Sequence, residues 1–134
     1  MPTTLVDSNV ILDIATEDEE WLDWSADALE RSAEHGRLAI NPIIYAEIAL
    51  GFSTIEDLNE VVPPGYFTRE ALPWEAAFLA GHAFLRYRRQ GGTRVHPLSD
   101  FYIGAHAAIA GYTLLTRDPR RYRTYFPKLR VLAP

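Results

Sequence analysis

The sequence predicts an α/β fold with three layers, in which helices cover both faces of a central parallel sheet of four to five short strands. Short β-favouring runs alternate with helical stretches along the chain, and this alternation is typical of parallel α/β sheets. Hydrophobic residues make up 48% of the chain and charged residues 23%, which suffices for one core and excludes a disordered chain. With 134 residues and no internal repeat or long linker, we expect a single domain over residues 1–134.

The first half of the chain predicts two strands and four helices. Val6 ends a short β-favouring run, and Ser8 is a candidate N-cap for the helix that follows. Gly36 ends a long amphipathic helix, and Asn41 with Pro42 forms a good N-cap and first helical residue. Strands are expected at residues 3–6 and 38–40, and helices at residues 8–15, 19–35, 42–50 and 54–62.

The second half begins after a break at residues 63–65, which read Pro-Pro-Gly. Apolar side chains at helical spacing start at Trp74 and stop at a pair of glycines. Ser99 is a candidate cap for a helix rich in small residues, which Gly111 closes. Helices are therefore expected at residues 74–90 and 99–110, and strands at residues 113–116 and 131–132.

The net charge of −5 hides a strong asymmetry along the chain. Residues 1–85 carry a net charge of −13, whereas residues 86–134 carry +8. This division is a reason to look for a polyanion on one surface and a basic partner on another, although two ordinary solvated surfaces show the same pattern. The average charge therefore does not exclude a nucleic-acid partner.

Cellular location is indicated by residue types and segments that the sequence lacks. The chain has no cysteine, which excludes disulfides, thiolate metal sites and a cysteine nucleophile. The first residues include no basic segment, and acidic and amide side chains interrupt their apolar run, so we expect neither a signal peptide nor a membrane span. The expectation is a cytoplasmic protein without membrane contact.

Four acidic residues stand where a parallel sheet presents side chains to a common cleft. Ligands of such sheets bind beyond the carboxyl ends of the strands. Asp7 directly follows the first strand, Asp100 opens a helix, and Asp118 follows the strand at residues 113–116. Glu47 lies about one and a half turns into its helix, among apolar neighbours. Taken singly, each acid is also explained as a helix cap, a turn residue or a solvated side chain.

Convergence of these four acids is a hypothesis with a chemical consequence. Carboxylates about 4 Å apart repel by roughly 4 kcal/mol per pair at an effective dielectric constant near 20, and some then take up protons. A divalent cation removes that cost, and ligation by oxygen alone favours Mg²⁺ or Mn²⁺ over zinc. Such a site suits the hydrolysis of phosphodiester bonds.

Four blocks of the sequence resemble those of PIN-domain ribonucleases, and specifically the VapC-type toxins of bacterial type II toxin–antitoxin pairs. The blocks read LVDSNVILD, YAEIALGF, LSDFYIGAHA and LLTRDPRRYRTYFP, and they span nearly the whole chain in that family's order and spacing. The resemblance implies a PIN-like fold and a Mg²⁺- or Mn²⁺-dependent endoribonuclease. The family's four acids and its two supporting polar positions fall on Asp7, Glu47, Asp100 and Asp118, and on Asn9 and Thr116.

The expected mechanism uses one or two divalent ions. They lower the pKa of a bound water, hold the scissile phosphate and neutralise charge on the leaving 3′-oxygen. Asp7, Glu47 and Asp100 are expected as the principal ligands, directly or through water. Asp118 completes the set, and family members differ in how strictly they need this fourth acid.

The basic C-terminal segment has two interpretations. Its arginines are candidates for guiding the RNA backbone toward the acids, and its tyrosines are candidates for stacking on bases. Alternatively, the segment is a surface turn and short helix whose arginines pair with acids of the first half. The arginines are Arg117, Arg120, Arg121 and Arg123, and the tyrosines are Tyr122 and Tyr125.

Protein partners are implied by the resemblance as well. A cognate antitoxin typically places a basic or aromatic segment over the acidic site, and homodimers are common among relatives. One interpretation forms a groove for an antitoxin segment between the helices at residues 19–35 and 41–52. The sequence does not identify the RNA, the antitoxin or the number of metal ions.

Other classes of protein fit less well. A receiver domain needs an adjacent acidic pair and a well-placed lysine, but the only lysine is Lys128. A haloacid-dehalogenase-like phosphatase needs a second aspartate where Asn9 stands. The remaining alternative is a catalytically silent PIN-like module that binds RNA or protein. The histidines His82, His96 and His106 are expected in structural or surface roles rather than as ligands.

Overall fold

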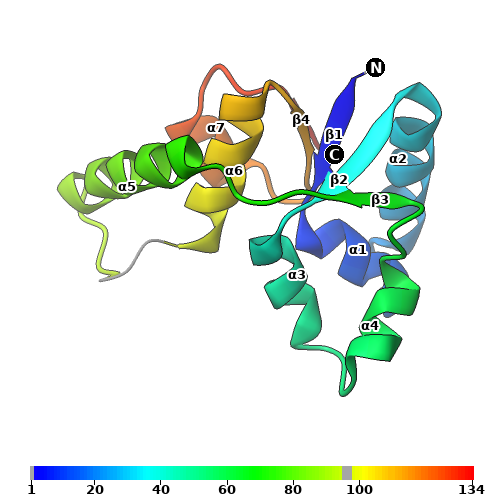
Figure 1. Ribbon diagram of the computed structural model, residues 1–134. Helices are drawn as coiled ribbons and strands as arrows, with labels where there is room; N and C mark the ends of the chain where they lie inside the picture. Colours follow the sequence, from blue (N-terminus) through cyan, green and yellow to red (C-terminus); the bar gives the residue numbers. More distant parts are fainter. Residues whose placement is uncertain (1, 95–97) are drawn as a thin grey trace.

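The computed structural model describes residues 2–94 and 98–134, and it contains one sheet of five parallel strands. The strand order is β3-β2-β1-β4-β5, so β1 lies at the centre (Figure 1). Leu5 of β1 pairs with Ala39 of β2 on one side and with Leu114 of β4 on the other. The strands are β1 (Thr3–Val6), β2 (Arg37–Ile40), β3 (Phe67–Arg69), β4 (Thr113–Leu115) and β5 (Val131–Leu132).

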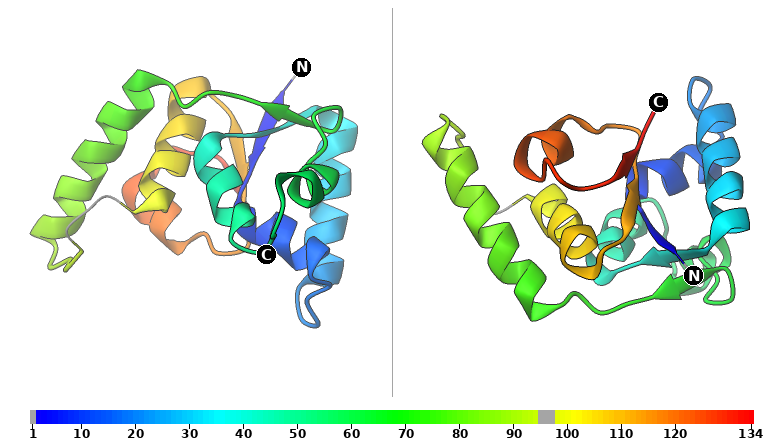
Figure 2. Two further views of the ribbon diagram at one scale, coloured as in Figure 1. Left: turned by 60° about the horizontal axis from the view of Figure 1, so that its bottom comes forward. Right: turned by 90° about the horizontal axis from the view of Figure 1, so that it is seen from above.

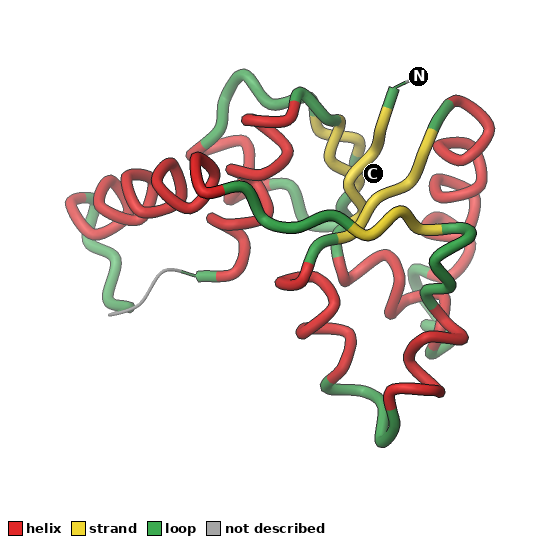
Figure 3. The backbone as a smooth tube through the Cα atoms, viewed as in Figure 1, coloured by secondary structure: helices red, strands yellow, loops and turns green. Residues whose placement is uncertain are grey.

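Helices cover both faces of this sheet, which confirms the predicted three-layer α/β fold. Figure 2 shows α1 and α2 on one side of the strands, and α5, α6 and α7 on the other. The helices α3 and α4 extend past the ends of the strands (Figure 3). The helices are α1 (Ser8–Ala15), α2 (Leu22–His35), α3 (Pro42–Ala49), α4 (Ile55–Val61), α5 (Trp74–Arg89), α6 (Ser99–Ala110) and α7 (Arg120–Tyr125).

The sheet is apolar because its central strands are covered from both sides. Leu5, Val6, Leu114 and Leu115 are fully buried, as expected for strands between two helical layers. The helices α6 and α7 approach each other closely at Gly104, where an added Cβ would lie 2.5 Å from the ring of Phe126. Among the helices of the described residues, none is both long enough and apolar enough to cross a membrane.

Apart from shifts of one to three residues at the ends of elements, such as α2 beginning at Leu22 rather than at residue 19, the structure differs from the sequence prediction in one strand and two helix caps. The edge strand β3 was not predicted, because three residues behind a Pro-Pro-Gly break carry too little periodicity to be distinguished from a loop. Asp7, and not Ser8, is the N-cap of α1, since its side chain accepts a hydrogen bond from the backbone N–H of Ser8. Ser99 is the first residue of α6 rather than its cap, and its hydroxyl makes no cap hydrogen bond.

Candidate functional site

The carboxylate of Asp7 lies at the carboxyl end of the central strand and is 4% exposed. Its Oδ1 atom accepts the backbone N–H of Ser8 at 2.8 Å. Its Oδ2 atom accepts the hydroxyl groups of Thr116 and Tyr122, each at 2.9 Å. Within residues 2–94 and 98–134, no lysine or arginine forms an ion pair with Asp7. A buried negative charge is therefore held by neutral donors alone.

This environment changes the acidity of Asp7. Burial, with a further contribution from the charges of Asp100 and Glu47, raises the pKa of Asp7 from 3.8 to about 6. The hydrogen bonds from Thr116 and Tyr122 oppose this rise, because they stabilise the charged form. Near neutral pH the carboxylate is ionised at a cost in free energy, which a cation bound beside it would remove.

Glu47 reaches the same end of the sheet from α3. Its Oε1 atom accepts the hydroxyl of Ser8 at 3.0 Å, and its Oε2 atom accepts the hydroxyl of Ser99 at 2.8 Å. These two serines are the first residues of α1 and α6. Glu47 therefore connects the starts of two helices that carry the neighbouring acids.

Asp100 lies in the first turn of α6, and its side chain is 31% exposed. Its Oδ1 atom is 3.2 Å from the hydroxyl of Tyr122, and its Oδ2 atom accepts a hydrogen bond from Arg121 at 3.1 Å. Asp100 is thus more accessible than Asp7, which is 4% exposed. It also lies beside a basic side chain.

Asp118 occupies a different position from the other three acids. Its backbone N–H donates to Thr116 Oγ1 at 3.2 Å, but its carboxylate is 61% exposed and lies 3.6 Å from Arg120. Asp100, Asp118, Arg120 and Arg121 line a common cleft of about 390 Å³. The fourth acid therefore lies on the rim of the cleft rather than in the buried cluster.

Hydroxyl groups separate the acids from one another. The Ser8 hydroxyl lies 3.0 Å from Glu47 Oε1 and 3.5 Å from Asp7 Oδ1, and the Tyr122 hydroxyl lies between Asp7 and Asp100. As a result, no three acidic or histidine side chains in the described part of the chain are grouped as ready ligands of a single ion. Of the four predicted acids, Asp7, Glu47 and Asp100 are therefore connected through hydroxyl groups, whereas the carboxylate of Asp118 is not.

The two supporting polar residues lie directly beside the acids. Thr116 Oγ1 donates its proton to Asp7 and accepts from the Nδ2 atom of Asn9 and from the backbone N–H of Asp118, both at 3.2 Å. One donated and two accepted bonds use all the hydrogen-bonding capacity of a hydroxyl. The Oδ1 atom of Asn9 accepts the backbone N–H of Arg117 at 3.1 Å. Asn9 and Thr116 together attach the segment after β4 to the start of α1.

Arg117 points away from the cleft, toward α1 and α2. Its guanidinium binds the buried carboxylate of Asp13 with two hydrogen bonds of 2.8 and 3.0 Å, and it lies over the ring of Trp21. Asp13 is 2% exposed and also accepts the hydroxyl of Ser25 at 2.8 Å. Arg117 therefore pairs with an acid of the first half of the chain, which is the second of the two interpretations of the arginines.

The tyrosines of α7 do not form a surface for base stacking, so that expectation is wrong. Tyr122 is 1% exposed and Tyr125 is 9% exposed, because they form the face of α7 that packs on the core. Tyr122 is instead a member of the acidic site that the sequence reasoning missed. The helical spacing of Tyr122, Tyr125 and Phe126 was the available signal, since it marks one buried face.

His106 is a core residue, as the sequence predicts. It is 1% exposed, and its Nδ1 atom lies 2.9 Å from the amide nitrogen of Asn41. Burial lowers the pKa of His106, although Glu70 lies 3.6 Å from its Nε2 atom. His82 is exposed on α5, and His96 lies outside the described residues.

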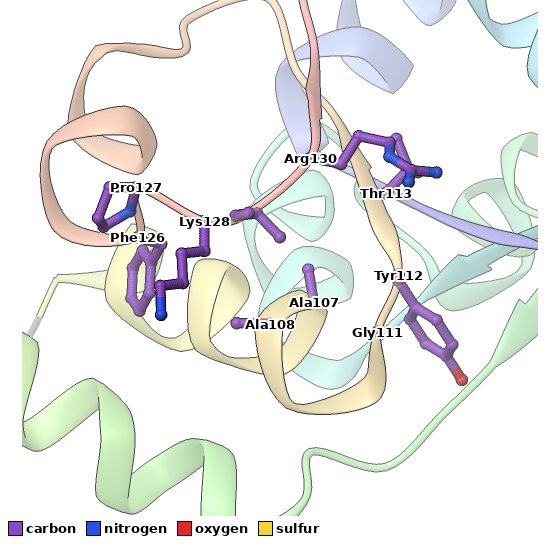
Figure 4. A pocket seen from close by; sticks show the side chains of 10 residues that line it. Ala107, Ala108, Gly111, Tyr112, Thr113, Phe126, Pro127, Lys128 and Arg130 are labelled. Atoms are coloured by element: carbon purple, nitrogen blue, oxygen red, sulfur yellow. The ribbon is translucent and has the colours of Figure 1, made fainter.

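A second hollow lies toward the opposite, amino end of the strands, between the start of β4 and the segment that leads into β5 (Figure 4). Its volume is about 430 Å³. Its charged lining residues are Lys128 and Arg130, and it has no acidic one. The acidic cluster at the carboxyl ends of the strands is therefore the site whose donors suit a divalent cation.

Comparisons with known proteins agree with this fold. A chain of VapBC2 from Rickettsia felis matches with a TM-score of 0.75 and 17% identity, covering 98% of both chains. A chain of VapBC-1 from nontypeable Haemophilus influenzae matches with a TM-score of 0.73 and 16% identity, covering 98% of this chain and 97% of that one. A chain of a toxin–antitoxin complex from Klebsiella pneumoniae matches with a TM-score of 0.70 and 19% identity, covering 96% of this chain and 95% of that one.

Sequence comparison identifies the family more directly than these structures do. At identities below 20% the structural likeness supports the fold alone. No curated protein matches the chain at a significant level. The profile of the PIN domain, however, matches residues 4–127, which include all four acids. This match covers most of the 134 residues, and the chain therefore belongs to the PIN domain family.

Proposed function

We propose that this protein is a divalent-metal-dependent endoribonuclease, the toxin of a VapBC-type toxin–antitoxin pair. The observation that carries the proposal is the carboxylate of Asp7, which is buried at the end of the central strand of a PIN domain and forms no ion pair with a lysine or arginine among the described residues. Asp100 and Glu47 lie next to it through bridging hydroxyls. This donor set has the chemistry of a site for Mg²⁺ or Mn²⁺.

The three connected acids have different parts in this proposal. Asp7 and Asp100 would hold the ion, since their Oδ2 and Oδ1 atoms both lie near one phenol oxygen. Glu47 would act directly or through water, because its two oxygens already accept serine hydroxyls. When bound, the ion supplies Lewis acidity toward water and the scissile phosphate, as in other metal-dependent nucleases.

The protein's own side chains would orient the reacting groups. Thr116 has its single proton committed to Asp7, which fixes the rotamer of that carboxylate. Asp118, exposed on the rim of the cleft, would accept a proton from an attacking water or hold a second ion. The leaving group of the hydrolysis would be the 3′-oxygen of the RNA.

RNA is the proposed substrate, and α7 is the proposed path for its backbone. Arg120 is 90% exposed, Arg121 is 41% exposed, and both line the cleft that contains Asp100 and Asp118. Arg123 is exposed on the same helix. Phosphate groups would replace the acids as partners of Arg120 and Arg121 when RNA enters. Arg117 is less suited to this role, because its guanidinium is bound to Asp13.

A cognate antitoxin is the proposed protein partner. The structural neighbours include a complex from Mycobacterium tuberculosis described as a member of the VapBC family of toxin–antitoxin systems, with a TM-score of 0.57. The acidic surface of this chain's first half would complement a basic segment of such a partner. A homodimer is also proposed, and sedimentation at several protein concentrations tests it.

A catalytically silent PIN-like module, binding RNA or another protein, is the second candidate. The observation in its favour is the hydroxyl group between each pair of connected acids, which leaves no ready group of three ligands in the described residues. The two candidates differ in turnover. A silent module would leave RNA uncut whatever ion is added, whether it binds RNA or another protein.

The deciding experiment is an RNA cleavage assay with the purified protein. Total RNA is incubated with the wild-type chain in Mg²⁺, in Mn²⁺ or in EDTA, and in parallel with Asp7→Asn. The proposal expects cleavage with either ion, none in EDTA, and a loss of at least about 100-fold in Asp7→Asn. Full activity of Asp7→Asn would refute the assignment of the site, and intact RNA in every sample would favour the silent module.

A further inference from the structure

The hydroxyl of Tyr122 lies between two of the proposed metal ligands. It is 2.9 Å from Asp7 Oδ2 and 3.2 Å from Asp100 Oδ1. Both carboxylate oxygens touch the same phenol oxygen, so they lie within about 6 Å of each other. A phenol has one proton to donate, and two carboxylates face it. The shorter distance assigns that proton to Asp7.

A cation that binds Asp7 Oδ2 must replace one of the hydrogen-bond donors of that oxygen. The Oδ2 atom accepts from Thr116 and from Tyr122 at 2.9 Å each, and the Nδ2 atom of Asn9 lies 3.5 Å away, so its lone pairs are fully used. Of these donors, Tyr122 is the one that also contacts Asp100 among the described residues. A cation that joins Asp7 Oδ2 to Asp100 Oδ1 therefore needs the position of the Tyr122 hydroxyl.

The ring of Tyr122 is held in place by its surroundings. It is 1% exposed and packs against α6 at Gly104, where an added Cβ would come within 3.0 Å of the ring. A ring packed in this way does not turn freely into solvent. Its hydroxyl therefore stays close to the two acids, and an entering cation must compete with it.

We propose that Tyr122 sets the metal affinity of this site, because its hydroxyl occupies the place between Asp7 and Asp100 that a bridging cation needs. The inference rests on the proposed function, since it assumes that these two acids hold the ion. Tyr122 is a positioning residue in this account. It holds the two carboxylates near each other without an ion and lowers the affinity for the ion that replaces it.

The test compares Tyr122→Phe with the wild type in Mn²⁺ binding. The variant keeps the buried ring and removes only the hydroxyl. We expect Mn²⁺ to bind Tyr122→Phe about tenfold more tightly, which corresponds to about 1.4 kcal/mol. Free Mn²⁺, measured by its electron paramagnetic resonance signal during titration, gives the dissociation constant without any nuclease assay.

Tyr125→Phe is the matched control for this comparison. Tyr125 is also a buried tyrosine of α7, but its hydroxyl bonds Gln90 at 3.0 Å and no acid. Its removal is expected to leave Mn²⁺ affinity unchanged. In thermal unfolding, Tyr122→Phe should melt below the wild type in EDTA and lose that deficit in saturating Mn²⁺, whereas the deficit of Tyr125→Phe should be the same in both.

Two results would overturn the inference. One is a Tyr122→Phe protein that binds Mn²⁺ no more tightly than the wild type, including the case in which neither binds it. The other is a wild-type protein in which the NMR signals of the Tyr122 ring are unaffected by saturating Mg²⁺. Failure of the proposed function looks different, because RNA then stays intact whatever the two affinities are.

Discussion

Replacing Asp7 with asparagine should make the fold more stable at neutral pH, although it removes a central residue of the site. Burial raises the pKa of Asp7 from 3.8 to about 6, so ionising this group in the folded protein costs free energy. A shift of about 2 pKa units, at about 1.36 kcal/mol per unit, corresponds to roughly 3 kcal/mol. Asparagine has nearly the same shape and carries no charge, so it avoids this cost, although its amide NH2 cannot accept the hydrogen bonds that Oδ1 and Oδ2 together accept from neighbouring donors, which offsets part of the gain.

The pH dependence follows from the direction of the shift. Because the pKa of Asp7 is higher in the folded than in the unfolded chain, its protonated form stabilises the fold. This contribution is fully present below about pH 4 and is lost as the pH rises through about 6. In EDTA, the stability of Asp7→Asn relative to the wild type should therefore rise by roughly 3 kcal/mol between about pH 4 and about pH 7.5.

Urea unfolding followed by tryptophan fluorescence measures this difference, since Trp21 and Trp24 are half-buried against the fold. For a chain of this size, 3 kcal/mol corresponds to a rise of roughly 10 °C in Tm. The matched control is Asp118→Asn, which removes an exposed charge and should change the stability by less than about 0.5 kcal/mol. The reasoning is refuted if Asp7→Asn gains no stability between the two pH values.

The remaining predictions concern the supports of the site and its path for RNA. Arg117→Ala leaves the carboxylate of Asp13 buried without its partner and should lower the free energy of unfolding by about 3 kcal/mol, and an unchanged urea midpoint would contradict this. Gly104→Ala places a Cβ 2.5 Å from the ring of Phe126 and should lower the free energy of unfolding by about 1 to 3 kcal/mol in the same measurement. An unchanged urea midpoint would show that α7 and Phe126 move aside at no cost in stability. Arg120→Ala combined with Arg121→Ala should weaken RNA binding and reduce the salt slope by about 1.4, and equal slopes would remove these residues from the RNA path.

Much of the fold could be predicted because local signals and tertiary packing agree. The strand at Thr3–Val6 and the helix at Ser8–Ala15 occur where the sequence predicts them, since apolar periodicity and a polar cap mark the same boundary. The helix at Ile55–Val61 is marked in the same way by Thr54, whose side chain caps it. The edge strand Phe67–Arg69 has no such signal, because its conformation comes from pairing with β2.

The candidate site could be predicted in its residue types but not in its contacts. The position of Asp7 after a strand, and of Asp100 in the first turn of a helix, follows from the order of the elements. The apolar neighbours of Glu47 indicate that it needs a partner, but they do not identify Ser8 and Ser99 as the donors. Those contacts depend on how three helices meet beyond the sheet.

Side-chain direction explains the other differences. Arg117 and Asp118 are adjacent in the sequence, yet one side chain points to Asp13 in the interior and the other points to the cleft. The basic composition of this segment does not separate the two directions. The same holds for Tyr122, since its residue type suits base stacking but its place on the inner face of α7 brings its hydroxyl to the acids.

The most direct test of metal-dependent hydrolysis at the acidic cluster is the chemistry of the RNA ends that the protein produces. Attack by an activated water with departure of the 3′-oxygen leaves a 5′-phosphate and a 3′-hydroxyl. Fragments from a Mg²⁺ reaction can be assigned by mass spectrometry, and by whether they accept a phosphate at the 5′ end without prior dephosphorylation. The account predicts 5′-phosphate fragments, whereas 2′,3′-cyclic phosphates with 5′-hydroxyls would contradict it, because the 2′-hydroxyl and not water would then be the nucleophile.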